Sequence, residues 1–191
     1  MRRIAALAAL VLAAGPVSLA AQGSYTEPGN RYTLDLPSGW RLVADLGNDI
    51  LQFGTGTAGE TVHVGFNTGV TALDPLCAMA DEAFRPVVSD VSAVVEPEDM
   101  RINGNPARWM VYGGRYVSGS TRVNLYNLSG CIAFEQGGGG VYVFSILTDQ
   151  SKEKLQESIE KIFETIRYAD APLTGVADRR PSGSPPPTHR L

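Results

Sequence analysis

The sequence predicts an α+β protein in which a largely antiparallel β-sheet lies between α-helices. Residues 141–147 are apolar at almost every position, so a strand formed there needs cover on both faces. Exposing one face would forgo about 1.5–3 kcal/mol for each large apolar side chain left in water. Residues 71–87 and 151–168 carry helical apolar stripes that can supply this cover. The order strands, helix, strands, helix then predicts a sheet between helical layers.

Three strands are predicted before the first helix. Residues 32–36 alternate apolar and polar side chains, as a half-buried strand does. Residues 49–53 and 61–67 form the next two strands. In the last of these, Val62, Val64 and Phe66 share one face, opposite His63.

Both helices have identifiable sequence signals. The first is expected to begin near Thr71, where Thr71 and Asp74 match a capping box and Pro75 suits an early helical position. Its apolar stripe consists of Leu73, Leu76, Cys77, Ala80, Phe84 and Val87. The stripe of the second helix consists of Leu155, Ile159, Ile162, Phe163 and Ile166.

A β-hairpin is predicted between the helices. Residues 100–116 contain Asn103-Gly104, the strongest two-residue hairpin signal, between two alternating segments. On the second hairpin strand, Trp109 and Val111 share one face, and Arg108, Met110 and Tyr112 share the other.

Shorter strands are predicted on either side of this hairpin. Residues 92–96 form a short strand that ends in a turn at residues 97–99. Residues 122–128 alternate again, and residues 131–134 extend or follow them.

Cys77 and Cys131 are the only cysteines. In an exported chain two cysteines usually pair, so we predict a disulfide that joins the first helix to the sheet. The alternatives are two buried free thiols or a redox-active pair. Redox motifs usually place their cysteines two residues apart, and these are far apart in the sequence.

Residues 1–20 have the pattern of a signal peptide. Arg2 and Arg3 precede an apolar segment, and Ser18-Leu19-Ala20 forms a small-x-small cleavage site. The chain is therefore expected to work outside the cytoplasm, in the periplasm or secreted. The alternative is an uncleaved N-terminal anchor, because the apolar segment is about as long as the shortest membrane-spanning helices.

The rest of the chain is expected to form one domain with short ends. Residues 21–31 are a short N-terminal leader, and residues 32–168 are the domain. Residues 169–191 are rich in proline, glycine and serine, and we expect this tail to be disordered.

Charge and residue types exclude several classes of function. The full chain has a formal charge of −4. Loss of the signal peptide at residues 1–20 removes two arginines and makes the charge −6. An acidic chain without clustered lysine and arginine is not expected to bind nucleic acid. We expect no cofactor, and a structural zinc site would need more histidine and cysteine ligands than are present. The acidic segments Asp81-Glu82 and Glu96-Pro97-Glu98-Asp99 could contribute to a weak calcium site, but they lack the alternating ligands of a calcium loop.

Two further features have a chemical and a simpler interpretation. His63 is the only histidine in the predicted domain and could act in a hydrolase, but no nucleophile motif accompanies it. Residues 137–140 are four glycines that run into a strand, whereas a phosphate loop opens a helix with lysine. We interpret them as a hairpin connection.

Three motifs resemble the PsbP-like family, which includes the bacterial DcrB-like proteins. Residues 32–40, which end in Pro37-Ser38-Gly39-Trp40, are similar to the opening strand, proline turn and tryptophan of that family. Residues 102–107 and the strand at 141–147 leading into the helix at 151–168 support the resemblance. It implies an α-β-α sandwich, and a role as a non-catalytic accessory subunit of membrane complexes.

The leading functional hypothesis is therefore a non-catalytic exported protein that binds or stabilises a membrane-associated protein complex. Its contacts are expected from residues 54–59 and 136–140, or from the tail. The alternatives are a small-molecule carrier and, third, a hydrolase that uses His63. The carrier would have an apolar cleft between sheet and helix near Trp40, Trp109 and Tyr112.

Overall fold

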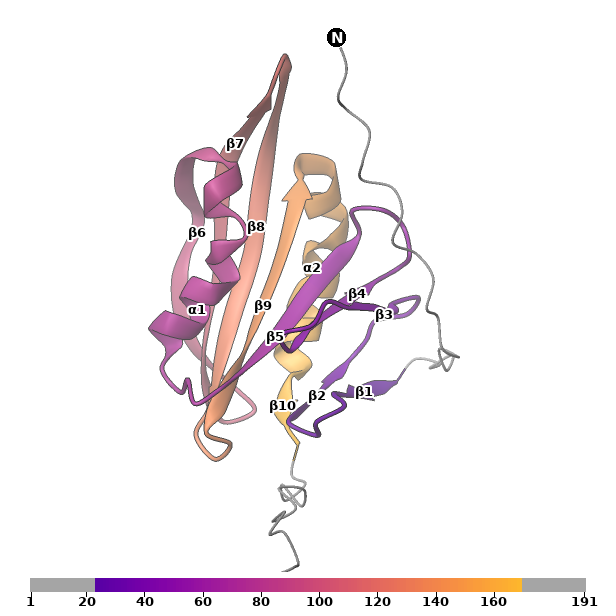
Figure 1. Cartoon of the computed structure of the whole chain (residues 1–191), viewed down its shortest axis with the longest axis vertical. Coiled ribbons are helices and arrows are strands. Elements are labelled where there is room, and N and C mark those ends of the chain that lie inside the picture. The colour runs from indigo at the N-terminus through magenta and orange to yellow at the C-terminus, as the bar shows by residue number, and fades with distance from the viewer. Residues whose placement is uncertain (1–22, 170–191) are drawn as a thin grey trace, which may run out of the picture.

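The computed structural model describes residues 23–169, which form two antiparallel sheets and two α-helices (Figure 1). The large sheet has seven strands in the order β3-β4-β5-β9-β8-β7-β6, and the small sheet has three in the order β1-β2-β10. The large sheet consists of β3 (Arg41–Asp45), β4 (Ile50–Gly54), β5 (Thr61–Thr68), β6 (Ser89–Ile102), β7 (Asn105–Ser118), β8 (Thr121–Phe134) and β9 (Gly139–Thr148). The small sheet consists of β1 (Ser24–Thr26), β2 (Tyr32–Asp35) and β10 (Arg167–Tyr168). The helices are α1 (Leu73–Glu82) and α2 (Asp149–Thr165), so the predicted α+β class is confirmed.

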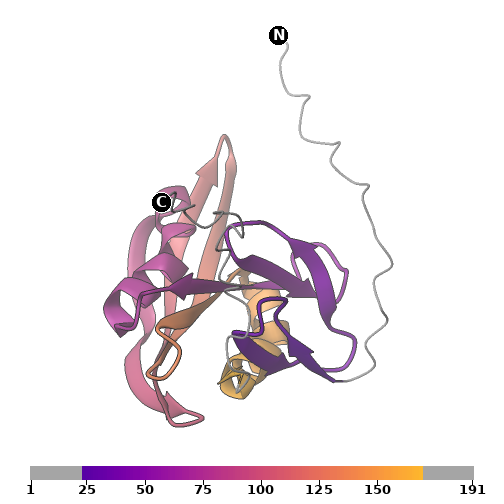
Figure 2. The same cartoon turned by 60° about the horizontal axis from the view of Figure 1, so that its bottom comes forward.

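Strand β9 is covered on both faces, as its apolar sequence predicts. Val141, Val143 and Leu147 belong to the large hydrophobic cluster that contains the buried face of α2. Tyr142 belongs to a second cluster with the buried face of α1, and Phe144 packs against that cluster. Figure 2 shows the two helices on either side of the long strands.

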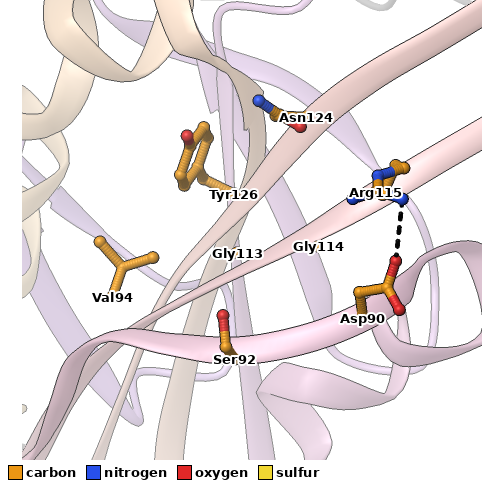
Figure 3. Close-up of a pocket in the computed structure, with 8 residues that line it drawn as sticks. All are labelled: Asp90, Ser92, Val94, Gly113, Gly114, Arg115, Asn124 and Tyr126. Atoms are coloured by element: carbon orange, nitrogen blue, oxygen red, sulfur yellow. Dashed lines mark ion pairs between the residues drawn. The ribbon is translucent and has the colours of Figure 1, made fainter.

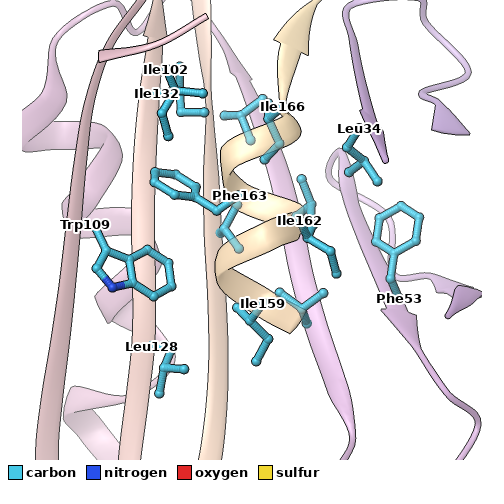
Figure 4. Close-up of a cluster of buried hydrophobic side chains, with 14 of the residues drawn as sticks. Leu34, Phe53, Ile102, Trp109, Leu128, Ile132, Ile159, Ile162, Phe163 and Ile166 are labelled. Carbon is cyan, nitrogen blue, oxygen red and sulfur yellow. The ribbon is translucent and has the colours of Figure 1, made fainter. Parts of the chain in front are cut away.

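The large cluster fills the space between α2 and the two sheets. Its α2 side chains are the predicted stripe Leu155, Ile159, Ile162, Phe163 and Ile166. In Figure 4 the α2 side chains Ile159, Ile162, Phe163 and Ile166 point between Trp109, Leu128 and Ile132 of β7 and β8 on one side and Leu34 of β2 and Phe53 of β4 on the other. This arrangement fixes α2 along the sheet.

Helix α2 ends earlier than its sequence pattern predicts. Its N-cap is Thr148, whose side chain accepts a hydrogen bond from the Ser151 backbone N at 3.4 Å. The predicted helix extended to Tyr168, but Ile166 is extended, and Arg167–Tyr168 form β10, which pairs with β2. Pairing with another strand therefore decides the end of the helix.

Helix α1 also differs from its prediction at both ends. Its N-cap is Ala72, with no side-chain cap, so the capping box of Thr71 and Asp74 does not form. Asp74 instead accepts a hydrogen bond from Arg108 at 2.7 Å. The helix stops at Glu82, and the end of its predicted stripe lies in the 3-10 turn Arg85–Val87 and its flank.

The disulfide between Cys77 and Cys131 is confirmed. Cys77 lies in α1 and Cys131 in β8, so the bond joins the helix to the middle of the large sheet. Both side chains are buried in the second cluster.

The edge strand β6 is longer than predicted. It runs without a break from Ser89 to Ile102, so the turn expected at residues 97–99 is wrong. Its pairing with β7 shifts register at three places, two of them near Val95. Proline has no backbone N–H. Pro97 is tolerated in β6 because the outer side of an edge strand faces solvent and pairs with no further strand.

Two other strands were not predicted. Arg41–Asp45 form β3, an edge strand whose pairing with β4 is irregular after Leu42. Ser24–Thr26, in the segment expected as a leader, form β1 and pair with β2. The strand expected across Ser129-Gly130 is continuous within β8.

The signal peptide predicted at residues 1–20 lies outside the described residues, and so does the predicted tail of residues 169–191 except for Ala169. Within residues 23–169, neither helix has the length and apolar character needed to cross a membrane.

Candidate binding surface

The aromatic residues expected near a cleft are not brought together. Trp40 and Trp109 are buried in the large cluster, and Tyr112 packs on the other face of the sheet, against the cluster of α1. The ring centroids of Trp109 and Phe163 are 5.2 Å apart, so α2 side chains fill the space beside Trp109. The guanidinium of Arg85 lies 5.1 Å from the centre of the Tyr112 ring.

His63 is packed into a row of aromatic rings. On β5 it stacks on Phe144 of β9, with 4.6 Å between ring centroids, and Phe144 in turn lies parallel to Tyr142. Desolvation by burial lowers the pKa of His63. In residues 23–169 no group of three His, Cys, Asp or Glu side chains could hold a metal ion.

Asp81 ties α1 to the sheet. Its carboxylate accepts hydrogen bonds from Asn127 Nδ2 at 3.0 Å, from Ser129 Oγ at 3.3 Å and from Arg85 at 3.3 Å. Asn127 also donates to the Ala80 carbonyl at 3.1 Å. Burial raises the pKa of Asp81. This network lies inside the protein. Asp81, which was considered as a calcium ligand, already accepts hydrogen bonds from Asn127, Ser129 and Arg85.

The two loops expected as one contact surface lie at opposite ends of β5. Residues 54–59 lead into Thr61, and the turn before β9 lies beside Thr68, which pairs with Gly139. Strand β5 has eight residues, so its two ends are about 23 Å apart. A single small surface cannot contain both loops.

The glycines at 137–140 allow close packing of the β8–β9 connection. A Cβ at Gly140 would lie 2.3 Å from a Leu76 methyl, and one at Gly137 would lie 2.3 Å from the Tyr168 ring. The hairpin interpretation is therefore confirmed. Gly137 and Gly140 are required because a larger residue at either position would clash with Tyr168 or Leu76.

An open pocket of about 210 Å³ lies on the outer part of the sheet, across β6, β7 and β8 (Figure 3). It is lined by Asp90, Ser92, Val94, Gly113, Gly114, Arg115, Asn124 and Tyr126. Gly113 pairs with Ser92 on one side and Tyr126 on the other. Because Gly113 has no side chain, the middle strand leaves a hollow between its neighbours.

The walls of this pocket are apolar on one side and charged on the other. The register shift between Ala93 and Val95 brings Val94 close to Gly113, where an added Cβ would lie 3.1 Å from a Val94 methyl. Arg115 forms an ion pair with Asp90 at 3.3 Å. Both charged side chains are more than half exposed, so this pair remains open to solvent.

Tyr126 connects the pocket to the start of α2. A hydrogen bond with Asp149 is the main cause of the raised pKa of Tyr126. The ammonium group of Lys152 lies 5.2 Å from the centre of the Tyr126 ring. These contacts hold the ring as one wall of the pocket.

Exposed hydrophobic side chains lie in and beside the pocket. Of six large hydrophobic side chains that are exposed among the described residues, Val94 lines the pocket, Val95 follows it on β6, and Val117 lies on β7 two residues after Arg115. We call Asp90, Ser92, Val94, Val95, Glu96 and Glu98, with the pocket, the β6 surface. Sequence analysis missed it, although a Gly113-Gly114 pair inside a strand is a signal for a hollow or a close approach.

Comparison with known proteins connects this architecture to solved structures. No family model and no curated protein sequence matches the chain. The solution structure of cyanobacterial PsbP (CyanoP) from Synechocystis sp. PCC 6803 is similar, with a TM-score of 0.56 and 12% identity, over 83% of this chain and 98% of that chain. The Ran-binding protein Mog1p of Saccharomyces cerevisiae is similar with a TM-score of 0.55 and 9% identity, over 78% of this chain and 95% of that chain.

The chain has the PsbP-like fold. This confirms the resemblance predicted from residues 32–40, 102–107 and 141–168. The PsbP-like opening motif has a structural role here, because the Trp40 backbone N donates to the Pro37 carbonyl at 3.0 Å and the indole is buried. At these identities the similarity describes the fold alone.

Proposed function

We propose that the protein is a non-catalytic, extracytoplasmic accessory protein that binds another protein through the β6 surface. The observation that carries this proposal is an open pocket at one edge of the sheet, with the exposed Val94 in its wall and the exposed Val95 and Val117 on the same two strands. Exposed apolar side chains that are grouped and rimmed by polar groups are typical of protein-interaction sites.

The location outside the cytoplasm is supported by two features. The signal-peptide pattern of residues 1–20 predicts export. The Cys77–Cys131 disulfide is of the kind that persists in oxidising compartments. The finer part of the proposal, that the partner belongs to a membrane-associated complex, follows from the sequence resemblance of residues 32–40, 102–107 and 141–168 to the PsbP-like family. Mog1p, named as Ran-binding, supports a protein partner in general.

The packing favours binding over catalysis or transport. His63 lies in an aromatic stack, where burial lowers its pKa, and its ring is an ordinary part of that packing. Phe163 packs on Trp109 where a carrier would need an open cleft. The β6 surface is instead accessible from solvent along its whole length.

Site-specific photo-crosslinking in the cells that make the protein tests this proposal. A photoreactive amino acid replaces Val95, which is 38% exposed on β6, and in a second strain it replaces Val43, which is 46% exposed on the opposite edge strand β3. We expect a covalent adduct with one protein from position 95, and none from position 43. Equal labelling at the two positions, or no adduct at position 95, would contradict the proposal.

A further inference from the structure

We infer that the partner contacts the β6 surface with an apolar side chain that enters the pocket and with a lysine or arginine that faces Glu98 on the same face of the strand. This inference rests on the proposed function. It concerns the chemistry of the partner, which the fold does not determine.

The charge of β6 is strongly one-sided. The strand contains four acidic residues and one basic residue, Arg101. Asp90 pairs with Arg115, and Asp99 pairs with Arg108, so two of the four carboxylates are matched by neighbouring side chains of β7. Among the described ion pairs none involves Glu96 or Glu98. Arg101 does not compensate for them through a salt bridge, because it donates to the Gly104 carbonyl.

Strand register places Glu98 on the same face as Gly113 of the pocket. Ser92 pairs with Gly113, Val95 with Val111, and Glu98 with Trp109, which are all odd-numbered positions on β7. Side chains at alternate positions of a strand point to one face. The partners of Val95 and Glu98 are two residues apart, which corresponds to about 7 Å along the strand. Gly113 in the pocket is four residues from Trp109, or about 13 Å along the strand, so a basic group that meets Glu98 would lie about 7 Å from Val95 and about 13 Å from an apolar group in the pocket.

The partner is recognised through its side chains, because the edge of β6 does not favour the addition of a strand. Its ladder is irregular at three places, and Pro97 has no backbone N–H to donate. Bulges, proline and charge are the features by which edge strands avoid pairing with other chains. A second copy is also disfavoured, since two β6 strands side by side in opposite directions would bring acidic residues together.

Complementary charge beside an apolar contact has a defined physical consequence. Exposed ion pairs contribute little to affinity individually, but they accelerate association and select against partners of the wrong charge. Their contribution falls as salt is added. The apolar contact at Val94 and Tyr126 would supply the salt-independent part of the binding.

The test uses the Val95 crosslinking strain and changes the charge of β6. We expect the double variant Glu96→Lys and Glu98→Lys to reduce the yield of the adduct about five-fold or more, and Glu98→Gln, which keeps the side-chain shape, to reduce it less. The control is Glu153→Lys on the exposed face of α2, which makes the same kind of charge change away from β6. The thermal midpoint of each purified variant confirms folding.

Mass spectrometry of the adduct then identifies the crosslinked peptide of the partner. A lysine or arginine within about three residues of the attachment point is expected from the strand spacing. Reversal of that partner charge to glutamate should restore the yield with the Glu96→Lys and Glu98→Lys variant. An adduct that is insensitive to the β6 charges, or a peptide without a basic residue, overturns this inference and leaves the proposed function standing. The absence of any adduct at position 95 overturns the proposed function itself.

Discussion

Gly130 of β8 lies directly beneath the ring of Phe163 in α2. A Cβ at Gly130 would be 2.6 Å from an atom of that ring and 2.9 Å from the Trp109 indole. Such distances are too short for carbon atoms, so the helix can reach the sheet here only because residue 130 has no side chain. The contact joins the two halves of the large hydrophobic cluster.

Gly130→Ala is therefore expected to lower the free energy of unfolding by about 2 kcal/mol, since overpacking of a well-packed core usually costs about 1–3 kcal/mol. Urea unfolding measures the change. Gly113→Ala is the matched control in the neighbouring strand, because its nearest obstacle is a methyl of the exposed Val94 at 3.1 Å, which can move aside. Equal losses for the two variants would show that the close approach of Phe163 does not control stability.

Loss of the disulfide should destabilise the fold without changing its architecture. Cys77 and Cys131 are 54 residues apart, and the chain-entropy model gives about 4 kcal/mol for a loop of that length. We expect the double variant Cys77→Ala and Cys131→Ala to show this loss in urea unfolding. The oxidised wild type should not react with a thiol reagent in denaturant, and it should react after reduction. Thiol labelling of the unreduced protein would contradict the bond.

The buried carboxyl of Asp81 predicts a pH dependence that is opposite to that of a typical surface carboxylate. Burial raises the pKa of Asp81 in the folded state above its ordinary value of 3.8, so the folded state holds the proton more tightly than the unfolded state. The stability from this group is present at low pH and is lost as the pH rises from about 3.8 through the folded pKa.

Asp81→Asn removes this titration and keeps an oxygen that can accept from Asn127. The wild type should therefore lose stability relative to this variant between pH 4 and pH 7. The free energy of unfolding of the wild type minus that of the variant then becomes more negative. Urea unfolding at the two pH values measures the difference. A difference between wild type and variant that does not change between pH 4 and pH 7 would refute the assignment.

Much of the fold could be predicted because its main signals are local and periodic. The apolar sequence of β9, the stripe of α2 and the alternation of Trp109 with Met110 each describe one element and its buried face. The Asn103-Gly104 turn is also correct, and both residues have positive φ. The structure adds a role that no local pattern could indicate, since Asn103 Nδ2 donates to the Ile166 carbonyl at 2.8 Å and so caps the end of α2.

The candidate site could not be predicted in the same way. Ser92, Gly113 and Tyr126 are far apart in the sequence, and only the register of β6, β7 and β8 places them side by side. The segment around Pro97 was expected to be a turn. Proline is tolerated in an edge strand, but the local sequence does not show that β6 is one. The loops at 54–59 and 136–140 were grouped by their composition, and the length of β5 separates them.

By itself, the sequence determined the class of the fold, the two helices, the faces of the central strands and the cysteine pair. These follow from the free energy of burying apolar side chains, which depends on their spacing within each element. The tertiary structure alone decided which strand became the exposed edge, which glycines lie under aromatic rings, and where charge remains uncompensated. Those properties depend on pairing between distant segments, and strand order and register are set by the packing of the whole molecule.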